Sequence, residues 1–276
     1  MIINHNLNAM NSHRQMGVNM NQGAKAMEKL SSGMRINRAG DDAAGLSISE
    51  KMRGQIRGLE QASRNAQDGI SLIQTAEGAL NETHAILQRM RELAVQGAND
   101  TNATEDRTAI KAELDELSAE VDRIAADTEF NTQNLVGTDG ATVGTVSIQT
   151  GANSANSTID ITLSDMTATT LGVDTGSLLV DDNTNANATI DAVQGAIDSV
   201  SAYRSELGAT QNRLEHTIKN LENGSENLQA AESRIRDTDM AKEMMNFTRT
   251  NILNQASQAM LAQANQQPQA VLQLLR

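Results

Sequence analysis

Hydrophobic residues recur every seven positions over a long stretch near the C-terminal end of the chain. The row consists of Val193, Val200, Leu207, Leu214, Leu221, Leu228 and Ile235. Because a helix returns almost to the same face after seven residues, such a row is typical of a helix in a coiled coil. The pattern predicts one long helix over about residues 190–236.

A second row with the same spacing lies in the N-terminal half and predicts a helix over about residues 43–97. It consists of Leu59, Ala66, Ile73, Leu80, Leu87 and Ala94. A third, shorter helix is predicted between residues 110 and 124, where hydrophobic residues alternate four and three apart. Helices with apolar stripes must bury them against one another. We therefore expect residues 43–130 and 190–236 to form a long antiparallel helical rod.

The start of the first long helix is marked by polar residues. Gly40 precedes Asp41 and Asp42, and either aspartate can accept hydrogen bonds from the free N–H groups of a helix N-terminus. Both are candidate helix caps.

The residues between about 131 and 189 follow a different pattern. They are rich in Thr, Asn, Ser, Gly and Asp, and no Lys or Arg occurs between Arg123 and Arg204. Hydrophobic and polar residues alternate in 143–148 and 159–163, which is typical of strands, with turns predicted at 138–140 and 153–156. The pattern indicates a small β-rich insertion at the tip of the rod, within a mainly α fold.

Both ends of the chain carry sparse hydrophobic stripes. Residues 250–275 contain no charged residue, and the first 34 residues set a few Ile, Leu and Met among Asn, Gln and Ser. Each stripe alone buries too little apolar surface to offset the ordering of the chain. We therefore expect residues 1–42 and 237–276 to form marginal helices that become ordered on pairing with each other and with other molecules. The side chains expected to carry self-assembly are Ile3, Leu7, Met10, Leu253, Met260, Leu261, Leu272 and Leu275.

Composition and charge argue against several classes of function. The net charge of −13 disfavours binding to nucleic acid, which requires basic patches, and to anionic membranes. Without cysteine, neither a disulfide framework nor a thiolate metal site can form. The N-terminus has no signal-peptide pattern, and no window reaches about 18 consecutive apolar residues, so no membrane span is expected.

The sequence lacks the motifs of several common classes of enzyme. A zinc protease would need His-Glu-x-x-His, and His5, His13, His84 and His216 do not have that spacing. There is also no Gly-x-Ser-x-Gly and no phosphate-binding loop. We expect no catalytic, metal or cofactor site, and hence a structural protein rather than an enzyme.

Several ordered motifs resemble bacterial flagellins. The N-terminal ones are LSSGMRINRAGDDAAG at 30–45, GISLIQTAEGAL at 69–80 and LQRMRELAVQ at 87–96; the C-terminal ones are NRLEHTI at 212–218, AESRIRDTDM at 231–240 and VLQLLR at 271–276. The resemblance covers about residues 1–136 and 190–276. It implies a short flagellin that polymerises into the flagellar filament for swimming motility, with residues 1–42 and 237–276 forming an inner tube. A hook–filament junction protein and a secreted adhesin are the alternatives.

The resemblance also implies partners and a location. Flagellins are exported without a signal peptide through the flagellar type III channel, with an export chaperone on the C-terminal segment, and assemble beneath a cap protein next to junction proteins. Arg89 and Leu93, with Glu113 on the next helix, resemble the segment that the vertebrate Toll-like flagellin receptor recognises.

The two flagellin-like signatures around residues 35 and 237 are expected to meet at one end of the rod. We therefore predict ion pairs of Arg35 or Arg38 with Asp237 or Asp239.

Overall fold

Most of the chain is helical. The computed structural model describes residues 6–137, 144–153 and 157–274, and beyond residue 266 only the backbone of the last helix. The long helices are α1 (Leu7–Ser32), α2 (Ala43–Gly97), α3 (Thr104–Asp127), α5 (Asn183–Arg236) and α6 (Met240–Leu274). The predicted fold class, mainly α with a small strand-containing insertion, is confirmed.

The chain divides into two compact units. Residues 1–54 and 226–276 make up one, the terminal unit, and residues 55–225 the other, the three-helix unit. The boundaries between them fall inside α2 and α5, so each of these helices contributes to both units.

The core of the three-helix unit consists of the predicted seven-residue rows. α2 and α5 run antiparallel, since Leu59 lies near Gly224 and Glu77 near Arg204. α3 runs back along α2, with Ile110 near Gly97. The fully buried side chains include Ile73, Leu80, Leu87, Leu114, Val121, Val193, Val200, Leu207 and Leu214. Leu59, Leu228 and Ile235 are only half-buried, so the deepest part of the seam spans the middle of each row.

Helix α5 begins at Asn183, seven residues before the predicted start at 190. Its first turn, Asn-Thr-Asn-Ala-Asn, has the composition of a loop. The turn is helical because Asp182 caps it, with Oδ1 accepting from the backbone N–H of Asn185 at 2.7 Å.

The insertion contains two antiparallel hairpins and a short helix. β1 (Glu129–Phe130) pairs with β2 (Gln133–Asn134), joined through Asn131 and Thr132, whose φ angles of 50° and 63° suit a tight hairpin turn. β3 (Thr145–Gln149) pairs with β4 (Thr158–Thr162), as predicted from the alternation. α4 (Ala168–Leu171) was not predicted. The predicted turn at 138–140 and most of the one at 153–156 lie outside the described residues.

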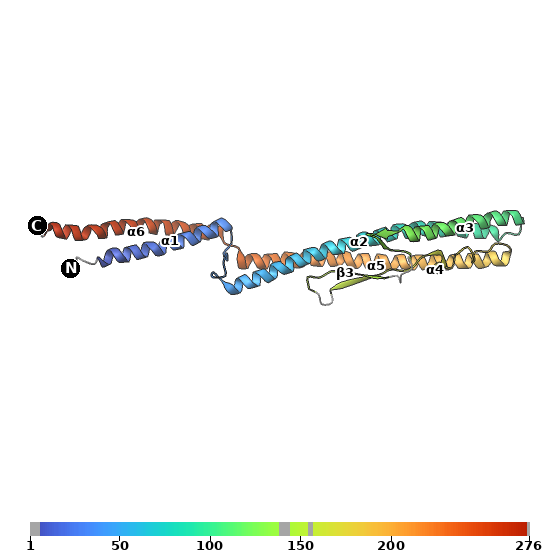
Figure 1. The fold of residues 1–276 in the computed structure, drawn as a ribbon, viewed down its shortest axis with the longest axis horizontal. Helices are drawn as coiled ribbons and strands as arrows, with labels where there is room; N and C mark the ends of the chain where they lie inside the picture. Colours follow the sequence, from blue (N-terminus) through green and yellow to red (C-terminus); the bar gives the residue numbers. More distant parts are fainter. Residues whose placement is uncertain (1–5, 138–143, 154–156, 275–276) are drawn as a thin grey trace. The chain divides into compact units, whose positions relative to one another are not determined.

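The prediction that the insertion lies at the tip of the rod was wrong for the β3–β4 hairpin. The hairpin packs alongside the body of α2, where Gly58 faces Ala152 and Gly69 faces Ile148. Asn65 donates from Nδ2 to the carbonyl of Gln149 at 3.1 Å, and Thr162 donates from Oγ1 to Glu206 of α5 at 2.8 Å. The hairpin can lie here because Gly58 and Gly69 of α2 leave room for Ala152 and for the Ile148 side chain. Figure 1 draws β3 beside α5.

The rest of the insertion returns along α3 toward the start of α5. Ser118 donates to the carbonyl of Val173 at 2.8 Å, and Asp122 accepts from the backbone N–H of Ala168 at 2.7 Å. Val173, Leu178 and Val180 are fully buried. This segment therefore extends the hydrophobic core and covers one side of α3.

In the terminal unit, α1 and α6 lie side by side and antiparallel (Figure 1). Asn6 contacts Ala264 near one end of the pair and Gly23 contacts Thr250 further along. α1 ends at Ser32 and is capped by Gly33, whose φ of 70° is the left-handed conformation that glycine adopts without strain.

Candidate functional site: the exposed hydrophobic surface of α1 and α6

The seam between α1 and α6 is made of small and polar side chains. The buried residues are Asn19, Gly23 and Ala26 on α1 and Thr250 and Ala264 on α6. Asn19 donates from Nδ2 to Ser257 Oγ at 3.2 Å, and Asn6 donates from Nδ2 to the carbonyl of Ala264 at 2.7 Å. The helix pair is therefore held largely by close approach and hydrogen bonds. Most of its large hydrophobic side chains are left for other contacts, although Met16, Phe247 and Leu261 are half-buried.

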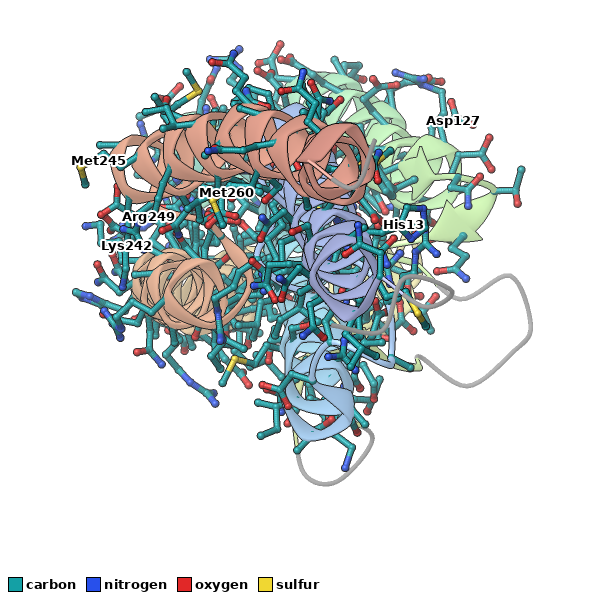
Figure 2. The ribbon with its side chains drawn as sticks, turned by 90° about the vertical axis from the view of Figure 1, so that its left-hand side faces the viewer. His13, Asp127, Lys242, Met245, Arg249 and Met260 are labelled. Carbon is teal, nitrogen blue, oxygen red and sulfur yellow. The ribbon has the colours of Figure 1, made fainter. Side chains whose placement is uncertain are left out.

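Those large side chains lie on the outside of the pair. Of the fourteen large hydrophobic residues that are exposed within the described part of the chain, eleven lie on α1 or α6. They are Leu7, Met10, Val18, Met20, Met27, Met240, Met244, Met245, Ile252, Leu253 and Met260. We call these eleven side chains the terminal hydrophobic surface. Figure 2 shows Met245 projecting away from its helix.

Two shallow grooves accompany this surface. One of about 400 Å³ runs between α1 and α6 and is lined by Asn11, Ser12, Gln15, Asn19, Leu253, Ala256, Ser257 and Met260. The other, of about 430 Å³, lies on α6 itself, between Met244, Met245, Thr248, Arg249 and Ile252. Both combine apolar walls with amides or hydroxyls, which suits a packed helix better than a small polar ligand.

Of the five predicted self-assembly residues whose side chains the structure describes, four belong to this surface. Leu7 and Met10 are about two-thirds exposed on α1, Leu253 and Met260 are exposed on α6, and Leu261 is half-buried. Ile3 and Leu275 lie outside the described residues, and Leu272 lies in the part of α6 described by backbone alone.

Sequence reasoning missed part of the surface. Met240, Met244 and Met245 precede the uncharged segment on which the prediction concentrated. The available signal was the density of methionine, a flexible apolar residue favoured at adaptable binding surfaces.

The connections between α1 and α2 and between α5 and α6 meet through their backbones. Met34 and Asp237 form an antiparallel bridge. Arg35 N–H donates to the carbonyl of Arg236 at 2.6 Å, and Thr238 N–H donates to that of Gly33 at 3.0 Å. The two flagellin-like signatures thus do come together.

The ion pairs predicted at this meeting point are not formed. The Arg35 guanidinium donates to the carbonyl of Ile235 at 2.6 Å, and Arg38 pairs with Glu28 at 3.0 Å. Asp237 accepts from Ser233 Oγ, while Asp239 accepts from the first N–H groups of α6. The aspartates are engaged on their own helices, and the backbone carbonyls at the end of α5 attract the arginine instead.

The two candidate caps of α2 have different partners. Asp42 Oδ1 accepts from the backbone N–H of Gly45 at 2.9 Å, the hydrogen bond that an N-cap makes. Asp41 Oδ2 accepts from the N–H groups of Asn37 and Arg38 in the preceding turn. These backbone hydrogen bonds lower the pKa of Asp41, Arg38 contributing most.

The three residues suggested for receptor recognition are only partly at the surface. Arg89 pairs with Glu113 of α3 at 2.9 Å and with Glu92 at 3.1 Å, and all three side chains are about half-exposed or more. These carboxylates raise the pKa of Arg89. Leu93 is 2% exposed and packs in the core, so in the described chain it does not share the outer face with Arg89.

No cluster of three or more His, Cys, Asp or Glu that could hold a metal ion occurs among the described residues. Within the same residues, no helix is long and apolar enough to cross a membrane.

Comparison with known proteins identifies the family. The model of the bacterial flagellin N-terminal helical region matches residues 3–142, and that of the C-terminal helical region matches residues 190–275. The chain is 68% identical to a flagellin of Halalkalibacterium halodurans and 55% identical to a flagellin of Bacillus subtilis, in both cases over the full length of both chains. The chain belongs to the bacterial flagellin family.

A solved structure agrees with this assignment. The crystal structure of Bacillus cereus flagellin is 34% identical, covers 57% of this chain and 88% of its own, and superposes with a TM-score of 0.51.

Family membership decides between the functions considered above. The chain is a structural subunit of the flagellar filament, and this prediction is confirmed over a junction protein or an adhesin. A structural role is consistent with the expectation that it is not an enzyme. Self-assembly into a filament requires contacts between copies of this chain.

Proposed function

We propose that the terminal hydrophobic surface is the polymerisation surface of the chain, through which residues 1–42 and 237–276 of neighbouring subunits pack into an inner tube. The observation that carries this is the distribution of side chains in the α1–α6 pair: the fully buried residues are all small or polar, whereas eleven large apolar side chains are exposed. An ordinary water-exposed helix pair has the opposite arrangement. Large contiguous apolar patches on a protein surface mark interaction sites.

The family motifs support further partners. We propose export through the flagellar type III channel to an extracellular filament, with a chaperone on the C-terminal segment and with cap and junction proteins at the growing and basal ends. An export chaperone fits a chain that must not polymerise before it leaves the cell, because the exposed residues of α6 would otherwise be free to associate.

Seeded growth tests the polymerisation surface. Purified chain is added to short filament fragments and growth is followed by electron microscopy, with circular dichroism reporting helix content. The intact chain should elongate the seeds, whereas a chain lacking residues 255–276 should stay monomeric.

Point variants test whether the exposed residues are needed for growth without being needed for folding of the monomer. Leu253→Gln combined with Met260→Gln should slow growth strongly while leaving the circular dichroism of the monomer unchanged. The matched control is Leu179→Gln, an exposed hydrophobic residue outside α1 and α6, which should grow normally. Normal growth of the double variant would rule out these two residues as polymerisation contacts.

A second proposal concerns the Arg89–Glu113 pair. The two exposed charges are paired across α2 and α3. We propose that the vertebrate Toll-like flagellin receptor contacts this ion pair. Leu93 then contributes indirectly, by packing in the core beneath it. Arg89→Ala should weaken receptor binding more than Arg123→Ala, a similarly exposed arginine on α3 that is paired within its own helix. Equal binding by both variants would contradict this role.

A further inference from the structure

The terminal hydrophobic surface is built mainly from methionine. Seven of its eleven side chains are methionines, namely Met10, Met20, Met27, Met240, Met244, Met245 and Met260. Each is about half-exposed or more, and Met245 and Met260 are 62% exposed. In contrast, Met90 and Met166 of the three-helix unit are buried.

Among the residues that the structure describes, these seven thioethers are the exposed ones, whereas Met16, Met34 and Met52 are half-buried. The sequence contains no cysteine and no tryptophan, and its single tyrosine, Tyr203, is buried. An oxidant that meets the unassembled chain therefore finds exposed sulfur on α1 and α6 before any other easily oxidised side chain.

We propose that this methionine surface is an oxidation-sensitive control on assembly, with peroxides as the class of reagent that modifies it. The inference rests on the proposed role of the surface in polymerisation. In the reaction, a thioether sulfur attacks one peroxide oxygen, the O–O bond breaks, and the other oxygen leaves as water or alcohol after proton transfer. The sulfur loses two electrons and becomes a sulfoxide, and the peroxide gains them.

Oxidation to the sulfoxide makes the apolar methionine side chains polar. A sulfoxide is polar and a hydrogen-bond acceptor, whereas the thioether is apolar and flexible. Packing a sulfoxide into an apolar contact between subunits leaves its oxygen without water. The seam between α1 and α6 has no methionine among its buried residues, so the helix pair itself persists and the effect falls on contacts between chains.

The test compares two sets of Met→Leu variants, since leucine has a similar volume and cannot form a sulfoxide. One variant replaces the seven surface methionines, and the control carries Met90→Leu and Met166→Leu. Each monomer is treated with hydrogen peroxide, freed of reagent, mapped by mass spectrometry and added to untreated seeds. Treated wild type and treated control should grow at least about tenfold more slowly than untreated chain, and the seven-residue variant should keep its untreated rate.

Recovery provides an independent readout if the seven-residue variant fails to fold or to grow. Oxidised wild type incubated with methionine sulfoxide reductases A and B and dithiothreitol should regain its growth rate. No recovery after complete reduction would overturn the proposal, as would unchanged growth of wild type carrying sulfoxides at these positions. Failure of untreated wild type to elongate seeds would instead refute the proposed polymerisation role.

Discussion

Single glycines in α2 decide where the β3–β4 hairpin lies. A Cβ at Gly58 would lie 2.7 Å from the Cβ of Ala152, and one at Gly69 would lie 3.2 Å from Cγ1 of Ile148. Glycine inside a helix costs about 0.5–1 kcal/mol relative to alanine. At these two positions the loss is offset by close packing of the hairpin on the helix.

Replacing Gly58 with valine should displace the hairpin. The added side chain overlaps Ala152, and overpacking of this kind costs about 1–3 kcal/mol. The measurement is the free energy of unfolding in urea. Gly78→Ala is the control, because a Cβ there meets no atom within 4 Å, and it should stabilise the helix by about 0.5–1 kcal/mol. Equal destabilisation by both changes would show that helix propensity, not packing, is responsible.

The turn before α2 should respond to acid through Asp41. Its folded pKa lies below the ordinary value, chiefly because Arg38 N–H and then Asn37 N–H bind the carboxylate. The stabilisation is therefore complete above the unfolded pKa of about 3.9 and is lost as the pH falls through the lower folded pKa. An NMR titration should show the amide signals of Asn37 and Arg38 shifting with a midpoint below that value, and Asp41→Asn should abolish the shift. A midpoint at or above the ordinary aspartate pKa would contradict the role of these hydrogen bonds.

At the scale of whole elements, the seven-residue rows are not uniform. Leu214 is fully buried between α2 and the β3–β4 hairpin, whereas Leu228, two steps further along the same row, is half-buried. The spacing of hydrophobic residues is the same at both places, but the third layer, from the hairpin, covers only the first.

The different burial of Leu214 and Leu228 should give different losses of stability when each is replaced by alanine. Leu214→Ala should lower the free energy of unfolding by about 2–5 kcal/mol, because it leaves a cavity in a closed core. Leu228→Ala should cost clearly less, because water already reaches that site. Thermal and urea denaturation of both variants provide the check, and equal losses would mean that the two positions are covered to the same extent in solution.

The α1–α6 pair buries different kinds of side chain from the three-helix unit. Its buried stripe is small and polar, so pairing depends on Gly23, which contacts Thr250 and lies close to Asn254, and on the Asn19–Ser257 hydrogen bond. Such a seam is too poor in apolar area to stabilise two helices strongly by itself. The ordering of the chain ends on assembly stays a prediction.

At the scale of the molecule, charge is divided unevenly along the sequence. Residues 55–225 contain ten Lys or Arg and 26 Asp or Glu, a formal charge of −16, whereas the remaining residues sum to +3. Three-helix units of neighbouring subunits brought close together would therefore repel one another much more strongly than terminal units, whose formal charge is small.

Salt should relieve this repulsion. Raising the ionic strength from about 0.01 M to about 0.15 M shortens the screening length from roughly 30 Å to roughly 8 Å. Seeded growth should accelerate over this range. A variant in which several exposed carboxylates of residues 55–225 are changed to amides should grow faster at low salt and depend less on salt. Growth that slows with added salt would indicate that attractive ion pairs between subunits dominate.

Much of the fold could be predicted because its signals are local. The seven-residue rows predict long helices without reference to any partner, and alternation predicts β3 and β4. The terminal hydrophobic surface was predicted in part, from the uncharged C-terminal segment and the sparse stripe on residues 1–34. The run of methionines at 240–245 was overlooked because charged residues surround it.

The sequence by itself thus determined the long helices, the β3 and β4 strands, the absence of catalytic motifs and the family, because periodicity and motifs depend on residues close together in the chain. Tertiary structure decided the packing of the β3–β4 hairpin against Gly58 and Gly69, the burial of Leu93, and the backbone pairing of Met34 with Asp237. Each of these depends on which surfaces meet, often between residues far apart in the sequence. Helical spacing shows that a face is apolar, but only packing shows whether another part of the chain covers that face or leaves it for a neighbouring subunit.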